Sequence, residues 1–200
     1  MDLRSYLLPC ASGGSGPFNL SSNTVLRVEG TISGSRDPTV YPIVTQQPLD
    51  EAYRAPYMLN RQRQALISAY SAQNISVIGS GTVDGNGWDW WYGVSHDLNG
   101  TYNIMVCRGG KLGPPTAPAC MIQRPKLLEF VDCHDVLIAG TSSGDGRLTF
   151  KNSPFWTLHP TFCDGVRMAN LTVLAPRDHG NTVRTFLYAS FGRNPGTCSP

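Results

Sequence analysis

Groups that could transfer protons gather at two places in the sequence. The run Asp132–Asp135 contains a cysteine and a histidine, so that an acid, a base and a thiol lie close together in the chain. An isolated cluster of this kind is weak evidence for catalysis, and we favour a turn at the start of a strand, where such residues are common. The second place is Asp178 and His179. A loop Asp-His pair is usually solvated, but this pair could also reach a substrate.

Sugar binding is the other chemistry that the residue types suggest. Trp88, Trp90 and Trp91 carry aromatic faces that suit the apolar faces of sugar rings, although we favour packing within the fold. Asp84 could be taken for a general acid, but an Asp-Gly pair is first of all a turn former. We therefore expect these residues to be structural.

The composition limits the possible folds and partners. The chain has 200 residues, of which 40% are hydrophobic and 15% charged, which argues against disorder. Sixteen basic and fourteen acidic residues give a formal net charge of +2, which is too small and too scattered to indicate a nucleic-acid partner. With 21 glycines and 15 prolines, we expect short strands joined by turns. No apolar run is long enough to cross a membrane.

The cysteines and the glycosylation sequons indicate an oxidising, secretory compartment. The six cysteines show no CxxC spacing that would indicate zinc, so we expect disulfides and no metal site. The pairing that we favour is Cys107 with Cys120, which bracket a stretch rich in Gly and Pro. The sequons lie at Asn19, Asn74, Asn99 and Asn170. The first residues lack the apolar run of a signal peptide, so we expect none in this chain.

A short phrase recurs along the chain and predicts the elements that position these residues. A polar Asn or Asp precedes an aliphatic run at Asn74–Gly79, Asp135–Gly140 and Asn170–Ala175, and more weakly at Asn23–Val28. We expect a strand in each of the first three, and a long excursion over roughly 85–122. The unequal spacing favours stacked β-helical coils with corner loops of different length, although a two-sheet sandwich remains an alternative. The expected inner column consists of Ile75, Val77, Val136, Ile138, Leu171 and Val173.

A series of motifs runs through the chain in a fixed order. Val77–Gly87 reads V-I-G-S-G-T-V-D-G-N-G and is followed by two adjacent tryptophans. Other stretches in the series are Gly16–Asn23, Arg124–Phe130, Asn152–Trp156, His159–Pro160 and Asn170–Pro176. Each motif is weak by itself, but their order resembles that of glycoside hydrolase family 28, the pectin-cleaving polygalacturonases. The resemblance covers about residues 16–182.

The resemblance implies a fold and an activity. Members of the family fold as right-handed parallel β-helices, the pectin-lyase-like solenoid, and hydrolyse the α-1,4 linkages of galacturonan with inversion. Inversion needs one carboxylic acid to protonate the leaving oxygen and a second carboxylate to activate a water. We therefore expect an all-β parallel β-helix that acts on pectin or polygalacturonate without a cofactor, and that is secreted to the cell wall.

The resemblance fails inside the family's catalytic motif. Asn181 and Thr182 match the first two positions of the family's N-T-D, but Val183 stands where the family has an aspartate. Valine can neither give nor accept a proton, and the family's later DD, GHG and RIK motifs are not found before Pro200. We therefore expect the chain to have no catalytic residue and to be inactive, as a truncated β-helix.

The expected organisation follows from where the resemblance starts and stops. Residues 1–15 form an atypical start, 16–182 the β-helical coils and 183–200 a divergent tail. The residues beside the broken motif that could contact substrate are Arg177, Asp178, His179 and Asn181. The alternatives to a pectin hydrolase are a catalytically dead carbohydrate-binding fragment and a non-functional truncated product. We expect a monomer or an aggregation-prone chain, because the last coil would leave an apolar face uncovered.

Overall fold

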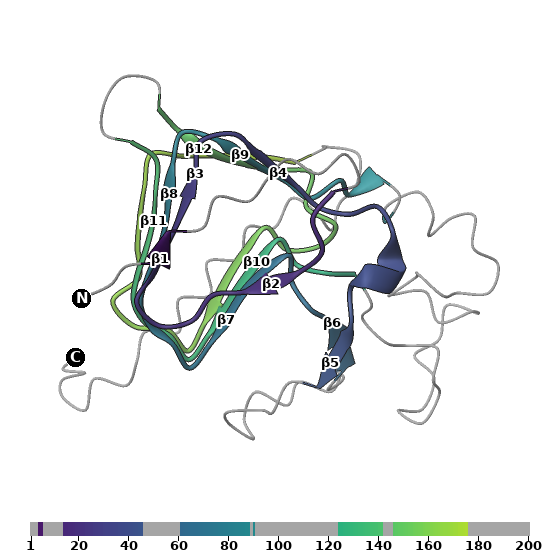
Figure 1. The fold of residues 1–200 in the computed structure, drawn as a ribbon, viewed down its shortest axis with the longest axis horizontal. Helices are drawn as coiled ribbons and strands as arrows, with labels where there is room; N and C mark the ends of the chain where they lie inside the picture. Colours follow the sequence, from purple (N-terminus) through teal and green to yellow (C-terminus); the bar gives the residue numbers. More distant parts are fainter. Residues whose placement is uncertain are drawn as a thin grey trace, which may run out of the picture.

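The chain winds through three sheets, with one strand in each sheet per turn, and the turns stack into a parallel β-helix (Figure 1). This computed structural model describes residues 4–5, 14–45, 61–88, 90, 124–141 and 146–175. The elements with described bounds are short strands and one 3-10 helix, η1 (Pro38–Val40), and the described residues Trp88 and Trp90 are helical. The predicted all-β class is confirmed.

Four coils follow one another in the described residues. The first consists of β2 (Phe18–Asn19), β3 (Thr24–Val28) and β4 (Thr31–Ser33), and the second of β7 (Ile67–Tyr70), β8 (Gln73–Gly79) and β9 (Thr82–Asp84). The third consists of β10 (Leu128–Val131), β11 (His134–Ala139) and β12 (Leu148–Lys151), and the fourth of β13 (Leu158–Thr161), β14 (Arg167–Ala169) and β15 (Leu171–Leu174). Outside these coils lie β1 (Arg4–Ser5), β5 (Ile43–Thr45) and β6 (Arg61–Arg63).

Strands at the same place in successive coils pair in parallel and form the three sheets. Sheet I has the order β13-β10-β7-β2, sheet II the order β1-β3-β8-β11-β14, and sheet III the order β15-β12-β9-β4. Among the described strands, only β5 and β6 pair antiparallel, outside the three sheets. Since each turn of the chain crosses three parallel sheets, the predicted β-helix is confirmed and the two-sheet sandwich is excluded.

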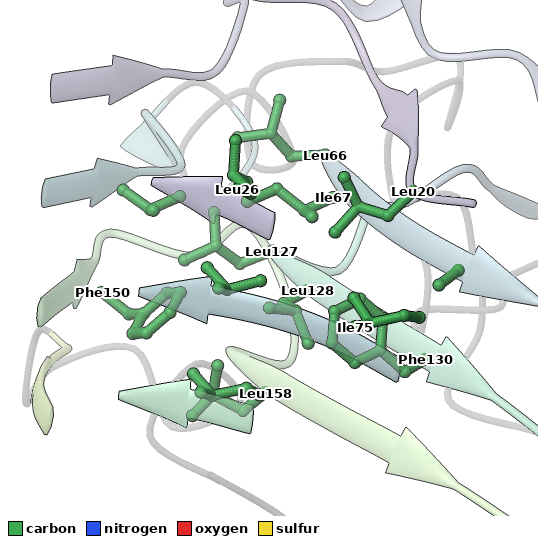
Figure 2. Close-up of a cluster of buried hydrophobic side chains, with 14 of the residues drawn as sticks. Leu20, Leu26, Leu66, Ile67, Ile75, Leu127, Leu128, Phe130, Phe150 and Leu158 are labelled. Atoms are coloured by element: carbon green, nitrogen blue, oxygen red, sulfur yellow. The ribbon is translucent and has the colours of Figure 1, made fainter. Parts of the chain in front are cut away.

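Alternate residues of the strands point into the helix and form one continuous core (Figure 2). In sheet II, Ile75 and Val77 lie in register with Val136 and Ile138, and none of the four is exposed. Phe130 of sheet I belongs to the same cluster. Burying an aliphatic or aromatic side chain of this size contributes about 1.5–3 kcal/mol, so stacking the coils is what stabilises strands that are too short to stand alone.

The phrase at Asn170–Ala175 forms a strand, but the sequence placed it in the wrong column. Leu171 and Val173 pair with residues of β12 in sheet III, where they are half-buried against the core. The position beside Ile138 in the fourth coil is taken by Met168 instead. The predicted inner column is therefore correct for its members in the second and third coils and wrong for those in the fourth.

The physical reason is that two corners of the coil need the same backbone conformation. The weak copy at Asn23–Val28 is the true equivalent of the phrase in β8, because β3 and β8 pair in register. Positive φ angles occur at Asn23 (61°), Asn74 (55°) and Asp135 (53°) before sheet II, and at Asn170 (51°) before sheet III. Asn and Asp tolerate this left-handed region better than other side chains. The phrase thus marks a corner without saying which one.

The expected long excursion begins after β9. Residues 85–88 and 90 are described, whereas 91–123 lie outside the described residues, as does the tail over 183–200. No helix in the described ranges is long and apolar enough to span a membrane.

Candidate functional site

Polar side chains line the face of sheet I that points away from the core. Leu128 and Phe130 of β10 belong to the core, so Glu129 between them points to the opposite side of the sheet. The parallel register places Ser68 of β7 and His159 of β13 on either side of Glu129. All three polar side chains are buried, which is unusual for a carboxylate and requires a partner for its charge.

Glu129 is the centre of a buried network. The Nζ of Lys126 and the Nδ1 of His159 both contact Oε1 of Glu129, the histidine at 3.2 Å. The hydroxyl of Tyr70 donates to Oε2 at 3.4 Å, and Oγ1 of Thr161 lies 3.2 Å from Nδ1 of His159. Lys126 precedes Glu129 by three residues, whereas His159 comes from the next coil. The network therefore ties three successive coils together, since Tyr70 lies in β7, Glu129 in β10 and His159 in β13.

The electrostatics of this network fix its charges. Burial raises the pKa of Glu129, but the attraction of Lys126 and the hydrogen bond with His159 outweigh it and bring the pKa to about 2. Burial and the nearby Lys126 lower the pKa of His159, so its imidazole is neutral at neutral pH. Glu129 is therefore a permanent carboxylate, and it holds an ion pair instead of donating a proton.

Two aromatic rings join a second cation to the network. Phe155 and Trp156 stack with 4.8 Å between their ring centroids, and the ring of Trp156 lies 4.5 Å from that of His159. Nζ of Lys126 lies 5.2 Å from the centroid of Trp156, and the guanidinium carbon of Arg124 lies 5.2 Å from that of Phe155. The sheet I cluster, as we call it, consists of Arg124, Lys126, Glu129, Phe155, Trp156 and His159. Cations beside aromatic faces suit the binding of an anionic sugar better than proton transfer.

The sheet I cluster was not among the residues that the sequence singled out. Its members fall in the motifs at Arg124–Phe130, Asn152–Trp156 and His159–Pro160, to which no role was given. One available signal was Glu129 in the middle of an apolar strand, because a glutamate is almost never fully buried unless it is paired. A second was the 30-residue offset between Glu129 and His159, which is the length of one coil here.

The run Asp132–Asp135 does not form a catalytic site. Asp132 and Asp135 both have positive φ angles, as a turn at the start of a strand requires, so the predicted turn is confirmed. Cys133 is buried and its backbone N–H donates to Sγ of Cys163 in the next coil at 3.4 Å. His134 is exposed and pairs with Asp164. The thiol packs inside the coil while the imidazole faces solvent, so the two do not act together.

Asp84 and Trp90 have the structural roles expected of them. Oδ1 of Asp84 accepts hydrogen bonds from the backbone of Asn86 at 3.0 Å and from Nδ2 of Asn152 at 3.1 Å, so it joins the second and third coils. Trp90 is buried edge-on against Tyr41, with 5.7 Å between the ring centroids. Trp88 is exposed, and Trp91 lies outside the described residues.

The remaining predicted site residues divide into two groups. Those outside the described residues are Asn99, Cys107, Cys120, Arg177, Asp178, His179, Asn181 and Val183. Those that are described are the sequon residues Asn19, Asn74 and Asn170, all exposed. Nδ2 of Asn74 donates to Oδ1 of Asn23 at 3.0 Å, which links the first two coils. Within the described ranges, no group of three His, Cys, Asp or Glu side chains is arranged to hold a metal ion.

Comparison with known proteins finds that these coils are similar to polygalacturonases. No protein-family model matches the chain. A probable polygalacturonase of Vitis vinifera is 26% identical over 195 residues, which are 96% of this chain and 32% of the relative. A polygalacturonase of Malus domestica is 25% identical over 171 residues, 84% of this chain and 27% of the relative. The chain thus spans about a third or less of the length of the curated relatives it matches.

Solved structures with the same fold give the same result. An exopolygalacturonase of Thermotoga maritima aligns with a TM-score of 0.54 and 25% identity, over 80% of this chain and 36% of its own. The family 28 exopolygalacturonase of Yersinia enterocolitica aligns with a TM-score of 0.57 and 18% identity, over 84% of this chain and 32% of its own. The fold of both is the right-handed parallel β-helix, which confirms the predicted handedness. The chain is thus related to the polygalacturonases of glycoside hydrolase family 28.

Proposed function

We propose that these coils bind galacturonan as the polygalacturonase-type part of a pectin-acting glycoside hydrolase. The observation that carries the proposal is the relation to polygalacturonases along 96% of the chain. The arrangement of the sheet I cluster supports it, because two cations and two aromatic rings meet on one face of the β-helix. Galacturonan offers the matching chemistry of carboxylates on sugar rings.

The same proposal assigns no hydrolysis to this chain by itself. An inverting glycosidase needs two carboxyl groups about 6.5–9.5 Å apart, one of which must carry a proton. In the coils that the structure describes, Glu129 is held as an anion by Lys126, and Asp84 is held by Asn86, Asn152 and Lys151. Val183 occupies the position at which the resembling family has an aspartate. Binding without cleavage is the role that fits these residues.

The organisation and location of the chain belong to the same proposal. The coils at 16–182 would carry the binding surface, with the tail at 183–200 and the segment at 1–15 outside it. Arg177, Asp178, His179 and Asn181 would contact the polysaccharide beyond the last described strand. Exposed sequon asparagines at Asn19 and Asn170 support passage through the secretory pathway to the cell wall.

Release of reducing ends from polygalacturonate tests the absence of hydrolysis. The folded 200-residue chain is incubated with polygalacturonate beside an active polygalacturonase as the positive control. We expect no release above the buffer blank, because Glu129 is held as an anion and Val183 stands where the resembling family has an aspartate. Steady release by the purified chain, lost on heating, would contradict this part of the proposal and establish the chain as a hydrolase.

A further inference from the structure

Arg124 is a buried cation with no polar partner among the described residues. Its side chain is 8% exposed, and its Nε has no hydrogen-bond partner. Among the described residues it has one recorded contact, the ring of Phe155 below its guanidinium group. Burial lowers the pKa of Arg124 to about 10, so the group stays charged at neutral pH. A buried guanidinium with unused donors is costly, and proteins normally supply an anion for it.

The neighbouring residues do not provide that anion. Lys126 lies on the same turn and already pairs with Glu129, and His159 is neutral. Two cations and one carboxylate leave the sheet I cluster with one uncompensated positive charge. The missing partner is therefore a single anionic group that reaches Arg124 from outside the described part of the chain.

The aromatic residues indicate what the anion is attached to. Phe155 lies under Arg124 and stacks on Trp156, which is a half-buried residue. An aromatic face beside a guanidinium group matches a sugar ring that carries a carboxylate, since the ring offers C–H groups and the carboxylate accepts two parallel N–H bonds from arginine. A lysine could not replace arginine in such a paired contact.

We propose that Arg124 is a binding residue for the carboxylate of a galacturonate unit, with Trp156 contacting the sugar ring. This inference rests on the proposed function and makes it specific. It assigns carboxylate recognition to the turn before β10, whereas the sequence suggested Arg177 for substrate contact.

Calorimetric titration with trigalacturonate and its fully methyl-esterified form tests the proposal on the whole chain. Wild type should bind the acid about tenfold or more tightly than the ester, the effect of losing one charge-assisted hydrogen bond pair. Arg124→Gln should weaken binding of the acid by the same factor and leave binding of the ester unchanged. The matched control is Arg167→Gln, an exposed arginine on β14 in sheet II, which should bind both ligands as wild type does.

Stability separates this binding role from a structural one. Because Arg124 has no polar partner among the described residues, Arg124→Gln should unfold at the same temperature as wild type or higher. If Arg124→Gln does not fold, Arg124→Lys keeps the charge and should still lose most of the preference for the acid. Equal binding of acid and ester by wild type, or unchanged binding by the folded Arg124 variants, would overturn the inference alone. Absence of any binding by wild type would overturn the proposed function with it.

Discussion

Replacing Lys126 with methionine is expected to lower the free energy of unfolding by about 3–5 kcal/mol at neutral pH. Lys126 and Glu129 are 3% and 1% exposed, so the substitution leaves a carboxylate buried without its counter-charge. The loss is large because the desolvation cost of Glu129 remains while the attraction that offset it is gone. Urea unfolding of the variant and wild type measures it.

The pH dependence of the unfolding free energy provides a second, independent test of this prediction. In wild type the pKa of Glu129 is about 2, below its ordinary value of 4.5, so the stability from this group is present above pH 4.5 and is lost as the pH falls towards 2. Without Lys126, burial dominates and raises the pKa of Glu129 above 4.5. The folded variant then binds a proton more readily than the unfolded chain, so its stability should rise as the pH is lowered from neutral.

Two further variants serve as controls for Lys126→Met. Lys151 pairs with Asp84 at 3.2 Å but is 37% exposed, so Lys151→Met should cost about 1 kcal/mol or less. The double variant Lys126→Met with Glu129→Gln removes both charges and should recover part of the stability lost in the single variant. If Lys126→Met costs no more than Lys151→Met, the buried ion pair does not stabilise the coils as described.

A methyl group at Gly79 is expected to destabilise the chain by about 4 kcal/mol or more. Gly79 ends β8 with a φ of +133°, a conformation that side chains rarely adopt, and a Cβ there would lie 2.0 Å from the carbonyl oxygen of Val28 in the first coil. Changing the backbone conformation of Gly79 or increasing the distance between the two coils would each cost substantial free energy. Since a typical domain is stable by about 5–15 kcal/mol, Gly79→Ala should leave little margin for folding.

A glycine in the neighbouring coil provides the matched control for Gly79. A Cβ added at Gly30 would meet nothing within 4 Å, so Gly30→Ala should change stability by only about 0.5 kcal/mol. Thermal unfolding followed by circular dichroism compares the two. Similar unfolding temperatures for Gly79→Ala and Gly30→Ala would mean that the close stacking of the coils does not require a glycine at position 79.

Much of the fold could be predicted because each stacked strand requires a recognisable local pattern of residues in the sequence. Ile75 and Val77 alternate with polar residues after an asparagine, which is what one buried strand face and one bent corner require. Asn170 shows the same local pattern before a strand of a different sheet. The sheet to which the following strand belongs could therefore not be assigned without the pairing register. Local chemistry specifies a corner, whereas long-range pairing specifies which corner it is.

The candidate site was harder to predict because its parts meet through the register of the coils. Arg124 and Lys126 precede β10, whereas Trp156 comes just before β13. The sequence around each of these residues does not indicate that they lie on the same surface. Clusters such as Asp132–Asp135 draw attention in a sequence because their reactive side chains are contiguous in the chain. A site on a β-helix is instead built from residues one coil apart, which the 30-residue offset from Glu129 to His159 illustrates.

Retardation of the native chain in a polyacrylamide gel containing polygalacturonate tests most directly whether these coils bind galacturonan. The formal net charge of +2 could attract any polyanion, so a gel containing poly-L-glutamate at the same carboxylate concentration is the necessary reference. We predict clear retardation by polygalacturonate and little by polyglutamate, because the aromatic rings of the sheet I cluster recognise the sugar as well as the charge. Equal mobility in the two gels would contradict the account.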